Sequence, residues 1–491
     1  SNMSTAFSSD GSSLMEPTIS EGATEHKPEI NIERDFDVKR TIEWICINKY
    51  ERVALQFPDE LLCYSASIVG ALRQATSALL FILGDTSYGS CCVDEVAGEH
   101  HKADALVHYG HSCLSQTGRL PVLFIFGQRP IDVEHCTSVI TSTLNDAALP
   151  VVLMYDVAYR HAIGLIETEL GRFYETFVCS SLNLPESESN SISSKESQDT
   201  VHSEESQSAR LHTKCGRTFK IPEGTNLGDF TICFIGSSSL TMTNIRMVYN
   251  QCQLYSYNPE SMECNMETPN SNKLLMKRYV MVEKAKDASI VGIVMGTLGI
   301  KDYLQTLDRM KHLCKITGKK TYTFSMGKIN VAKLANFLEI DVFVLISCAE
   351  NTLLDSKEFY KPIVTPYEME LACNENLQWT GEYETDFRQL NKIEISEEPR
   401  KLEHDVSIIT GKIRTLGVEE VQNESSGALL SRDEALTLAT QDAGANFLHS
   451  RQWQGLEQKL GETEVVKAVK GQTGIAMSYT DGAGGDNTQP R

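Results

Sequence analysis

The sequence lacks the features of several common functional classes. It contains no run of lysines or arginines, and 66 acidic residues against 45 basic ones give a net charge of −21. A sequence-independent nucleic-acid binder needs cations to displace the counterions of phosphate, so we expect no direct nucleic-acid partner. The longest apolar runs, 78–83 and 120–126, are far shorter than the ~20 residues that span a bilayer. We therefore expect no membrane segment.

We expect no secretory leader from the first part of the sequence. Residues 3–35 are polar and acidic and contain no apolar stretch like the centre of a signal peptide. We expect residues 1–35 to be a disordered N-terminus and the protein to be cytoplasmic. Because disulfides rarely persist in a reducing compartment, the 14 cysteines are expected to be buried hydrophobes, metal ligands or reactive thiols.

The short motifs of many enzymes and metal sites are absent as well. There is no GxxxxGK[ST] phosphate loop, no GxGxxG after the first predicted strand, no GxSxG elbow and no HExxH helix. The paired Cys-x2-Cys spacing of zinc fingers and the Cys-x3-Cys-x2-Cys run of ordinary radical enzymes do not occur either. Any metal site must therefore be assembled from separated cysteines.

What the sequence does contain is an alternation of short apolar strands and helices. The helical patterns include 61–73, 272–286 and 302–315. Near-continuous apolar, β-branched runs are typical of strands buried on both faces. Such strands are predicted at 52–57, 79–84, 103–109, 121–126, 151–155, 175–179, 230–235, 290–295, 321–325, 342–348 and 406–410. Strands separated by helices predict an α/β fold with parallel sheets.

A weak internal repeat suggests three similar α/β domains related by one pseudo-symmetry axis. In two copies a cysteine follows the third strand, namely Cys113 and Cys348, although generic βαβ units can resemble one another by chance. We predict the following order: disordered 1–35, domain 1 at 36–148, domain 2 at 149–285, domain 3 at 286–413 and a partly docked tail at 414–491. A serine- and glutamate-rich insert at 185–210 is expected to be disordered.

Four of the 14 cysteines follow predicted strands, where ligands bind in open parallel sheets. They are Cys91, Cys92, Cys113 and Cys348. Burial is the ordinary role of any single cysteine, and we expect it for those in helical patterns: Cys46, Cys63, Cys136 and Cys314. Cys215, Cys252, Cys264 and Cys373 are expected in loops. Cysteines from separate domains can hold a [4Fe–4S] cluster. Three thiolates would leave one iron open to a chelating amine and carboxylate, such as those of S-adenosylmethionine.

The segment GDTSYGSCCVDEVAGEHHKADALVHYGHSCL, residues 84–114, resembles the signature of the diphthamide biosynthesis family. The resemblance continues in order through FPDELL (57–62), GTLGI (296–300), AKLANF (332–337) and DVFVLISC (341–348). VSIITGKI (406–413) and SRQWQGLE (450–457) are similar to the second subunit of the eukaryotic enzyme. Apart from the acidic insert, the resemblance covers roughly residues 38–460.

The resemblance implies three α/β domains around a [4Fe–4S] cluster that cleaves S-adenosylmethionine. The 3-amino-3-carboxypropyl radical so formed would add to C2 of a histidine imidazole in translation elongation factor 2. The ligands implied by position are Cys92, Cys113 and Cys348. Because successive side chains of an extended segment face opposite ways, we expect only one of Cys91 and Cys92 to face the iron. A ligand from the middle domain has no matching motif here, and Cys179 is the nearest candidate.

This departure favours an accessory subunit that helps to keep the cluster of a homologous first, catalytic subunit reduced. By family analogy, the electrons would come from a small iron-binding diphthamide protein and its reductase. Two alternatives stay open. In the first alternative, the chain is a fully catalytic subunit that binds S-adenosylmethionine itself. In the second, it is a scaffold whose cysteines no longer bind iron. No catalytic residue is assigned by the sequence.

Overall fold

The computed structural model describes residues 31–84, 89–185, 209–222, 224–354, 356–395, 403–411 and 413–416. The chain divides into two units, residues 1–426 and 427–491, and every described residue belongs to the first. The predicted tail beyond residue 416 and most of the serine-rich insert therefore lie outside the described residues. Within the described ranges, no helix combines the length and the apolar character that crossing a membrane requires.

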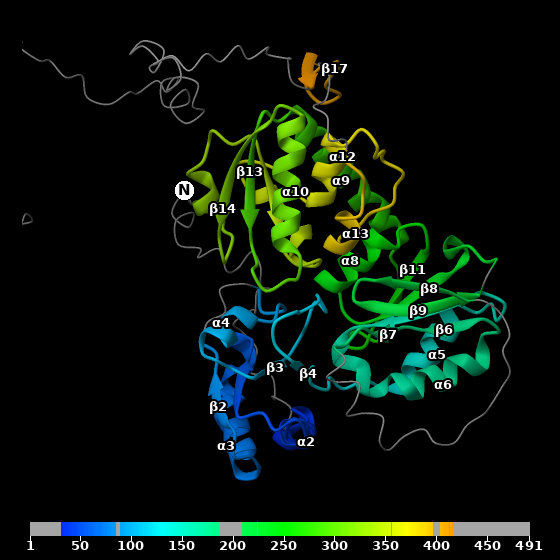
Figure 1. Cartoon of the computed structure of the whole chain (residues 1–491). Helices are drawn as coiled ribbons and strands as arrows, with labels where there is room; N and C mark the ends of the chain where they lie inside the picture. The colour runs from blue at the N-terminus through cyan, green and yellow to red at the C-terminus, as the bar shows by residue number, and fades with distance from the viewer. Residues whose placement is uncertain are drawn as a thin grey trace, which may run out of the picture. The chain divides into compact units, whose positions relative to one another are not determined.

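The first sheet contains four parallel strands in the order β2-β1-β3-β4 (Figure 1). Its elements are α1 (Ile32–Asp35), α2 (Val38–Asn48), β1 (Arg52–Gln56), η2 (Asp59–Tyr64), α3 (Ser65–Ala75), β2 (Leu79–Ile82), α4 (Glu95–His100), β3 (Ala105–Tyr109) and β4 (Val122–Ile125). Trp44 of α2 and Ile68 of α3 share a buried core with Leu55 and Val107 of the strands. Helix α1 lies within the segment predicted to be disordered, so that prediction is wrong for residues 32–35.

The second sheet has the order β12-β11-β10-β5-β6, and only its edge strand β12 is antiparallel. Its elements are α5 (Val133–Thr143), β5 (Val151–Tyr155), η3 (Val157–Ala162), α6 (Ile163–Phe173), β6 (Phe177–Cys179), η4 (Leu227–Asp229), β10 (Thr231–Ile235), α8 (Leu240–Val248), β11 (Gln253–Asn258) and β12 (Glu263–Met266). Beside it lies a small antiparallel sheet that the sequence did not predict: β7 (Ser181–Leu182), β8 (Ala209–Lys214) and β9 (Arg217–Pro222). Strand β8 includes residues 209 and 210 of the predicted disordered insert.

The third sheet is again parallel, in the order β14-β13-β15-β16. Its elements are α9 (Thr268–Asp287), β13 (Ile290–Met295), α10 (Tyr303–Ile316), β14 (Lys320–Ser325), α11 (Val331–Ala335), β15 (Val342–Ile346), η5 (Asn351–Leu353), η6 (Ser356–Glu358), β16 (Ile363–Val364), α12 (Pro366–Cys373) and α13 (Phe387–Leu390). Helix α9 falls mostly within the predicted second domain, yet its Val282 and Ala285 pack in the core of this sheet.

An antiparallel hairpin of β17 (Glu403–Val406) and β18 (Ile413–Leu416) ends the described chain. The predicted strand at 406–410 is wrong, because the backbone turns at Ser407. The Ser407 hydroxyl accepts the N–H groups of Ile409 and Thr410, and the Ser407 carbonyl accepts that of Gly411. Side-chain hydrogen bonds of this kind stabilise a turn at the expense of an extended strand.

All three sheets share one strand order among their first four parallel strands. In each, the second strand along the chain lies at the edge beside the first, followed by the third and the fourth. The α/β fold with parallel sheets predicted from the sequence is therefore confirmed. The loops after the first and third strands of each sheet leave from the same carboxyl edge, where parallel α/β sheets bind their ligands.

The described chain also contains a buried ion pair that holds α9 against α12. The guanidinium of Arg278 donates to both carboxylate oxygens of Glu368, at 2.5 and 2.7 Å. Glu368 also accepts the hydroxyl of Tyr383 and the N–H of Thr365, completing a capping box at the start of α12. Its side chain is fully buried, so all its hydrogen bonds must come from the protein.

We expect Glu368→Ala to destabilise the described unit by about 3–5 kcal/mol, the usual cost of leaving one member of a buried ion pair without its partner. Thermal and urea unfolding, followed by circular dichroism, measure the effect. The control is Glu169→Ala, which removes the exposed pair of Glu169 with Arg172 and should cost less than about 1 kcal/mol. Equal effects of the two substitutions would contradict this account.

Candidate metal centre

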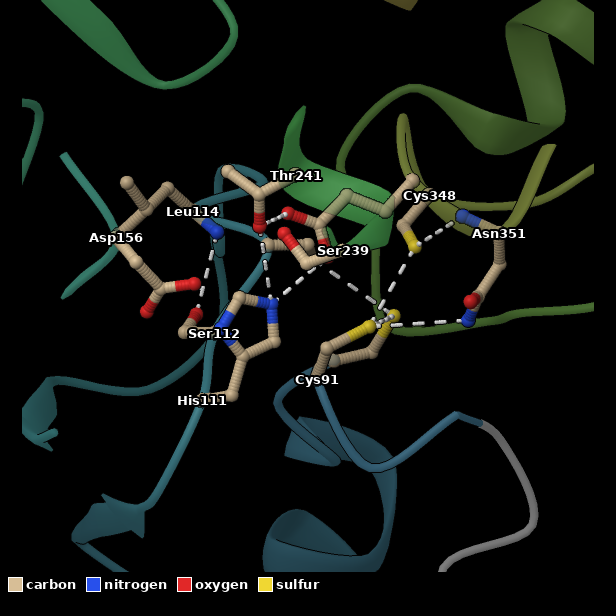
Figure 2. Close-up of polar contacts among 12 residues, drawn as sticks. Cys91, His111, Ser112, Leu114, Asp156, Ser239, Thr241, Cys348 and Asn351 are labelled. Atoms are coloured by element: carbon tan, nitrogen blue, oxygen red, sulfur yellow. Dashed lines mark hydrogen bonds and ion pairs between the residues drawn. The ribbon is translucent and has the colours of Figure 1, made fainter. Parts of the chain in front are cut away.

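Four cysteines reach one buried space from three loops that follow strands. Cys91 and Cys92 lie between β2 and α4, Cys113 follows β3, and Cys348 follows β15. The structure thus joins the carboxyl edges of the first and third sheets, and Figure 2 shows Cys91 and Cys348 with their sulfurs facing each other. This is the convergence that strand ends in separate sheets led us to expect.

The four sulfurs all lie within 4.8 Å of one another. The distance from Cys91 Sγ to Cys348 Sγ is 3.7 Å, and Cys92 Sγ lies 4.0 Å from the sulfurs of both Cys91 and Cys113. Each cysteine is at most 7% exposed. The partly buried side chain of Ile300, from the loop after β13, packs against them. The space is therefore closed to bulk water and lined with sulfur.

Cys91 and Cys92 both point into the cluster, contrary to the expectation that only one would do so. That expectation assumed an extended backbone, whereas Gly89–Cys92 forms a turn in which the Cys92 N–H donates to the Gly89 carbonyl at 3.0 Å. The Cys91 carbonyl accepts the N–H of Cys113 at 3.1 Å. Because a turn removes the strict alternation of a strand, two adjacent side chains reach the same side.

Polar groups around the sulfurs come mainly from the loop after β15. Asn351 donates its backbone N–H to Cys348 Sγ at 3.3 Å and its side-chain amide to Cys91 Sγ at 3.7 Å (Figure 2). Cys113 lies 3.2 Å from the hydroxyl of Ser115. Donors that face sulfur stabilise negative charge on it. Asn351 carried no motif in the sequence, and its position directly after a predicted strand end is the only signal that pointed to it.

The sulfurs determine one another's ionisation. Hydrogen bonds from Cys348, Cys91 and Cys92 lower the pKa of Cys113 well below its ordinary value, although burial acts to raise it. The hydrogen bond to Cys113 is in turn the largest of the causes that raise the pKa values of Cys91, Cys92 and Cys348. Without a metal, the group therefore resists ionisation of all four thiols together.

A second polar cluster beside the sulfurs includes the second sheet. His111 Nε2 lies 2.9 Å from the Glu350 carboxylate and 3.4 Å from the hydroxyl of Thr241, which donates to Glu350 at 2.7 Å. Figure 2 shows Asp156 and Ser239, from the ends of β5 and β10, around the same group. Burial acts to lower the pKa of His111, but the charge and hydrogen bond of Glu350 prevail and raise it to about 9. These contacts link the loops of all three sheets.

The other sequence candidates have structural roles or lie elsewhere. Cys179 packs in the apolar core of the second sheet and is not a member of the sulfur group. His108 is buried on β3 and contacts the His111 carbonyl at 3.0 Å. Asp94 caps α4.

Four predictions for the remaining cysteines are wrong. Cys46 and Cys63 are exposed rather than buried, and Cys264 and Cys373 lie in β12 and α12 rather than in loops.

A small cavity of about 60 Å³ adjoins Cys113. Its lining includes Ser115, Cys215, Lys301 and Arg388. Pockets for drug-sized ligands usually measure about 300–1,000 Å³. This cavity is therefore far too small to enclose a nucleoside.

The donor set fits a soft metal centre. Four buried thiols are the ligands of both a single tetrahedral zinc or iron ion and an iron–sulfur cluster. For metal–sulfur bonds of ~2.3 Å, a tetrahedron has six sulfur–sulfur edges of roughly 3.8 Å; three of the six sulfur pairs here measure 3.7–4.0 Å, and all lie within 4.8 Å. A four-iron cube is larger and needs the sulfurs to separate. All four sit on turns and loops, so that separation leaves the strands in place.

The fold and the site together define an α/β protein in which loops of separate parallel sheets bring four buried cysteines together, a group that could hold a metal. Residues 57–384 match the family described as "Putative diphthamide synthesis protein". The chain belongs to this family, as the resemblance in its sequence predicted.

Curated relatives support the same conclusion over nearly the full length. The chain is similar to 2-(3-amino-3-carboxypropyl)histidine synthase subunit 2 of Danio rerio, at 45% identity over 98% of each chain. The protein of the same name from Schizosaccharomyces pombe is 35% identical, covering 96% of this chain and 95% of its own, and that of Homo sapiens is 33% identical, covering 92% and 94%. The predicted resemblance to an enzyme subunit is confirmed by these names.

Solved structures share the fold. The crystal structure of Dph2 from Pyrococcus horikoshii matches with a TM-score of 0.53 at 18% identity, over 75% of this chain and 96% of that one. A second crystal structure, of Dph2 from Pyrococcus horikoshii with a 4Fe-4S cluster, matches with a TM-score of 0.52 at the same identity and coverage.

We expect Gly299→Ala to disturb the loop that carries Cys91 and Cys92. A Cβ at Gly299 would lie 2.4 Å from the backbone carbonyl oxygen of Val93, so one loop must shift. The four buried thiols should then react faster with a maleimide, by at least fivefold. Gly70→Ala on α3, where a Cβ meets nothing within 4 Å, is the matched control. Unchanged thiol protection in Gly299→Ala would contradict the prediction.

We expect Glu350→Gln to lower the pKa of His111 from about 9, because the charge and hydrogen bond of Glu350 are the largest causes that raise it against burial, with smaller contributions from Asp156 and Cys113. A folded pKa raised above the unfolded 6.5 stabilises the fold fully below pH 6.5, and that contribution disappears as the pH rises through about 9. Imidazole NMR titration measures the pKa, and unfolding midpoints at pH 6 and 10 measure the linkage. A His111 pKa that stays near 9 in the variant would show that Glu350 is not the cause.

Proposed function

We propose that this chain is the accessory, cluster-bearing subunit of a heterodimeric diphthamide synthase. The complex would transfer the 3-amino-3-carboxypropyl group of S-adenosylmethionine to C2 of a histidine imidazole in translation elongation factor 2. This chain would hold a [4Fe–4S] cluster and supply electrons that keep the catalytic subunit's cluster reduced. The single observation that carries the proposal is the convergence of four buried cysteine sulfurs within 4.8 Å.

The similarity findings support both the cluster and the subunit. One matched crystal structure is of a Dph2 with a 4Fe-4S cluster, and full-length relatives are named subunit 2 of the synthase. The ligands assigned from the resemblance are Cys92, Cys113 and Cys348. The shared strand order of the three sheets supports three pseudo-repeated units around this site.

A bound cluster supplies one-electron chemistry, and the chain's own residues provide the setting for it. Burial of the sulfurs excludes water, and hydrogen bonds to sulfur from Asn351 favour the more negative, thiolate-rich state. The His111–Glu350–Thr241 contacts fix the loops that carry Cys113 and Cys348.

The proposed partners follow from this role. They are a homologous first subunit that binds S-adenosylmethionine and carries the reaction, a small iron-binding diphthamide protein with its reductase, and translation elongation factor 2 as the protein substrate. The cavity of about 60 Å³ beside Cys113 is too small for S-adenosylmethionine, which favours binding by the partner. We place the complex in the cytoplasm, where elongation factor 2 works.

The decisive experiment measures iron, zinc and sulfide in the full chain, purified without oxygen together with the first subunit. The cluster of this chain is isolated by comparing wild type with the double variant Cys113→Ala/Cys348→Ala, and Cys46→Ala, an exposed cysteine, is the control. We expect the variant to lose about four irons and four sulfides per complex. Modification of elongation factor 2 by the reductase system should fall at least tenfold.

Two outcomes would overturn the proposal. Loss of one zinc or iron without sulfide would assign a mononuclear site to the four thiols. Loss of the cluster with full modification activity would leave the chain as a scaffold for its partner.

A further inference from the structure

The proposed function assigns Cys92 as a ligand of the cluster but gives no role to its neighbour Cys91. We propose that Cys91 is a fourth thiolate ligand of the cluster, so that all four irons are held by cysteine. No iron of this subunit is then open to the amine and carboxylate of S-adenosylmethionine. This inference rests on the proposed function, because it presupposes a cluster in this chain.

The distances give no reason to set Cys91 apart from the other three cysteines. Its sulfur lies 3.7 Å from that of Cys348, closer than the 4.0 Å between Cys92 and Cys113, two of the assigned ligands. It is 7% exposed, the same as Cys113. A bystander cysteine beside a three-ligand site would turn its sulfur away from the group, and Cys91 turns toward it.

The backbone holds Cys91 in that orientation. Its carbonyl accepts the N–H of Cys113, which joins the two loops directly. On the other side of the pair, the side-chain amide of Gln56 donates to the Cys92 carbonyl at 2.8 Å. The side-chain oxygen of Gln56 accepts the backbone N–H of Asp94. The adjacent sulfurs are thus fixed by hydrogen bonds at both ends of the turn.

The surroundings of the Cys91 sulfur also suit a ligand. Asn351 directs its side-chain amide at Cys91 Sγ and its backbone N–H at Cys348 Sγ (Figure 2). Gly89 leaves the space for this amide, because a Cβ there would lie 2.2 Å from Asn351 Nδ2. By comparison, the buried thiol of Cys136 packs in an apolar core. A donor facing sulfur is useful when the sulfur carries charge.

Saturation of the cluster decides between two roles that the sequence left open. With three thiolates, one iron of a [4Fe–4S] cluster is free to bind a chelating co-substrate. With four, each iron has a cysteine ligand, and the cluster can pass electrons without binding S-adenosylmethionine. The fourth sulfur would therefore make this subunit an electron carrier by coordination chemistry alone.

The test uses the full chain loaded with iron and sulfide, treated with one equivalent of ferricyanide and examined by electron paramagnetic resonance. An open cluster gives up one electron to ferricyanide and one Fe²⁺ to solution, leaving a paramagnetic [3Fe–4S]⁺ cluster. We expect little of this signal in wild type and at least five times more in Cys91→Ala. Cys215→Ala, a cysteine that lines the cavity beside Cys113 but lies outside the sulfur group, should match wild type.

Mössbauer spectra of the wild-type chain, with and without S-adenosylmethionine, test the same point without any substitution. We expect identical spectra. A distinct iron site that appears with S-adenosylmethionine, or a wild-type [3Fe–4S]⁺ signal equal to that of Cys91→Ala, would overturn the fourth ligand and leave the proposed cluster intact. Absence of a cluster from the wild-type chain would instead refute the proposed function on which the inference depends.

Discussion

Four cysteine sulfurs share a buried space in which, without a metal, burial and mutual contact oppose the ionisation of all four together. The loops and the polar groups around the sulfurs are arranged to meet this constraint. The loops after β2, β3 and β15 must approach closely enough to bring the sulfurs together, and neighbouring groups must donate hydrogen bonds rather than compete as acceptors. A metal centre that balances the negative charge of several thiolates relieves the mutual suppression of their ionisation.

The fold brings these loops together through a strand order that is repeated in all three sheets. Each sheet places its first and third strands side by side, so their following loops leave from one edge. The first and third sheets place cysteines at this edge: Cys113 and Cys348 follow their third strands, and Cys91 and Cys92 follow the second strand β2. The second sheet instead contributes Asp156, Ser239 and Thr241 around His111 and Glu350 (Figure 2). The middle sheet thus acts through polar contacts that hold the cysteine loops, and its own Cys179 packs in a hydrophobic core.

Much of this was accessible from the sequence because buried parallel strands have a clear apolar signature. The strands at 52–56, 151–155 and 290–295 and the convergence of Cys113 with Cys348 all followed from that pattern. Local backbone geometry was not accessible in the same way. The turn at Gly89–Cys92 turns both cysteines inward, and the side chain of Ser407 converts a β-branched run into a turn. Asn351 and Glu350 acquire their roles only through contacts between residues distant in the sequence.

The separation of the ligands along the chain also governs when the site can exist during synthesis. Cys348 follows Cys91 by 257 residues, and at ~5–20 residues per second a ribosome needs roughly 10–50 s to add that length. During this interval the first sheet, with three of the four thiols, is already available to fold. The nascent chain therefore presents an incomplete, oxidisable group of thiols until the third sheet emerges, and the four-sulfur group is complete only when nearly the whole described unit has been made.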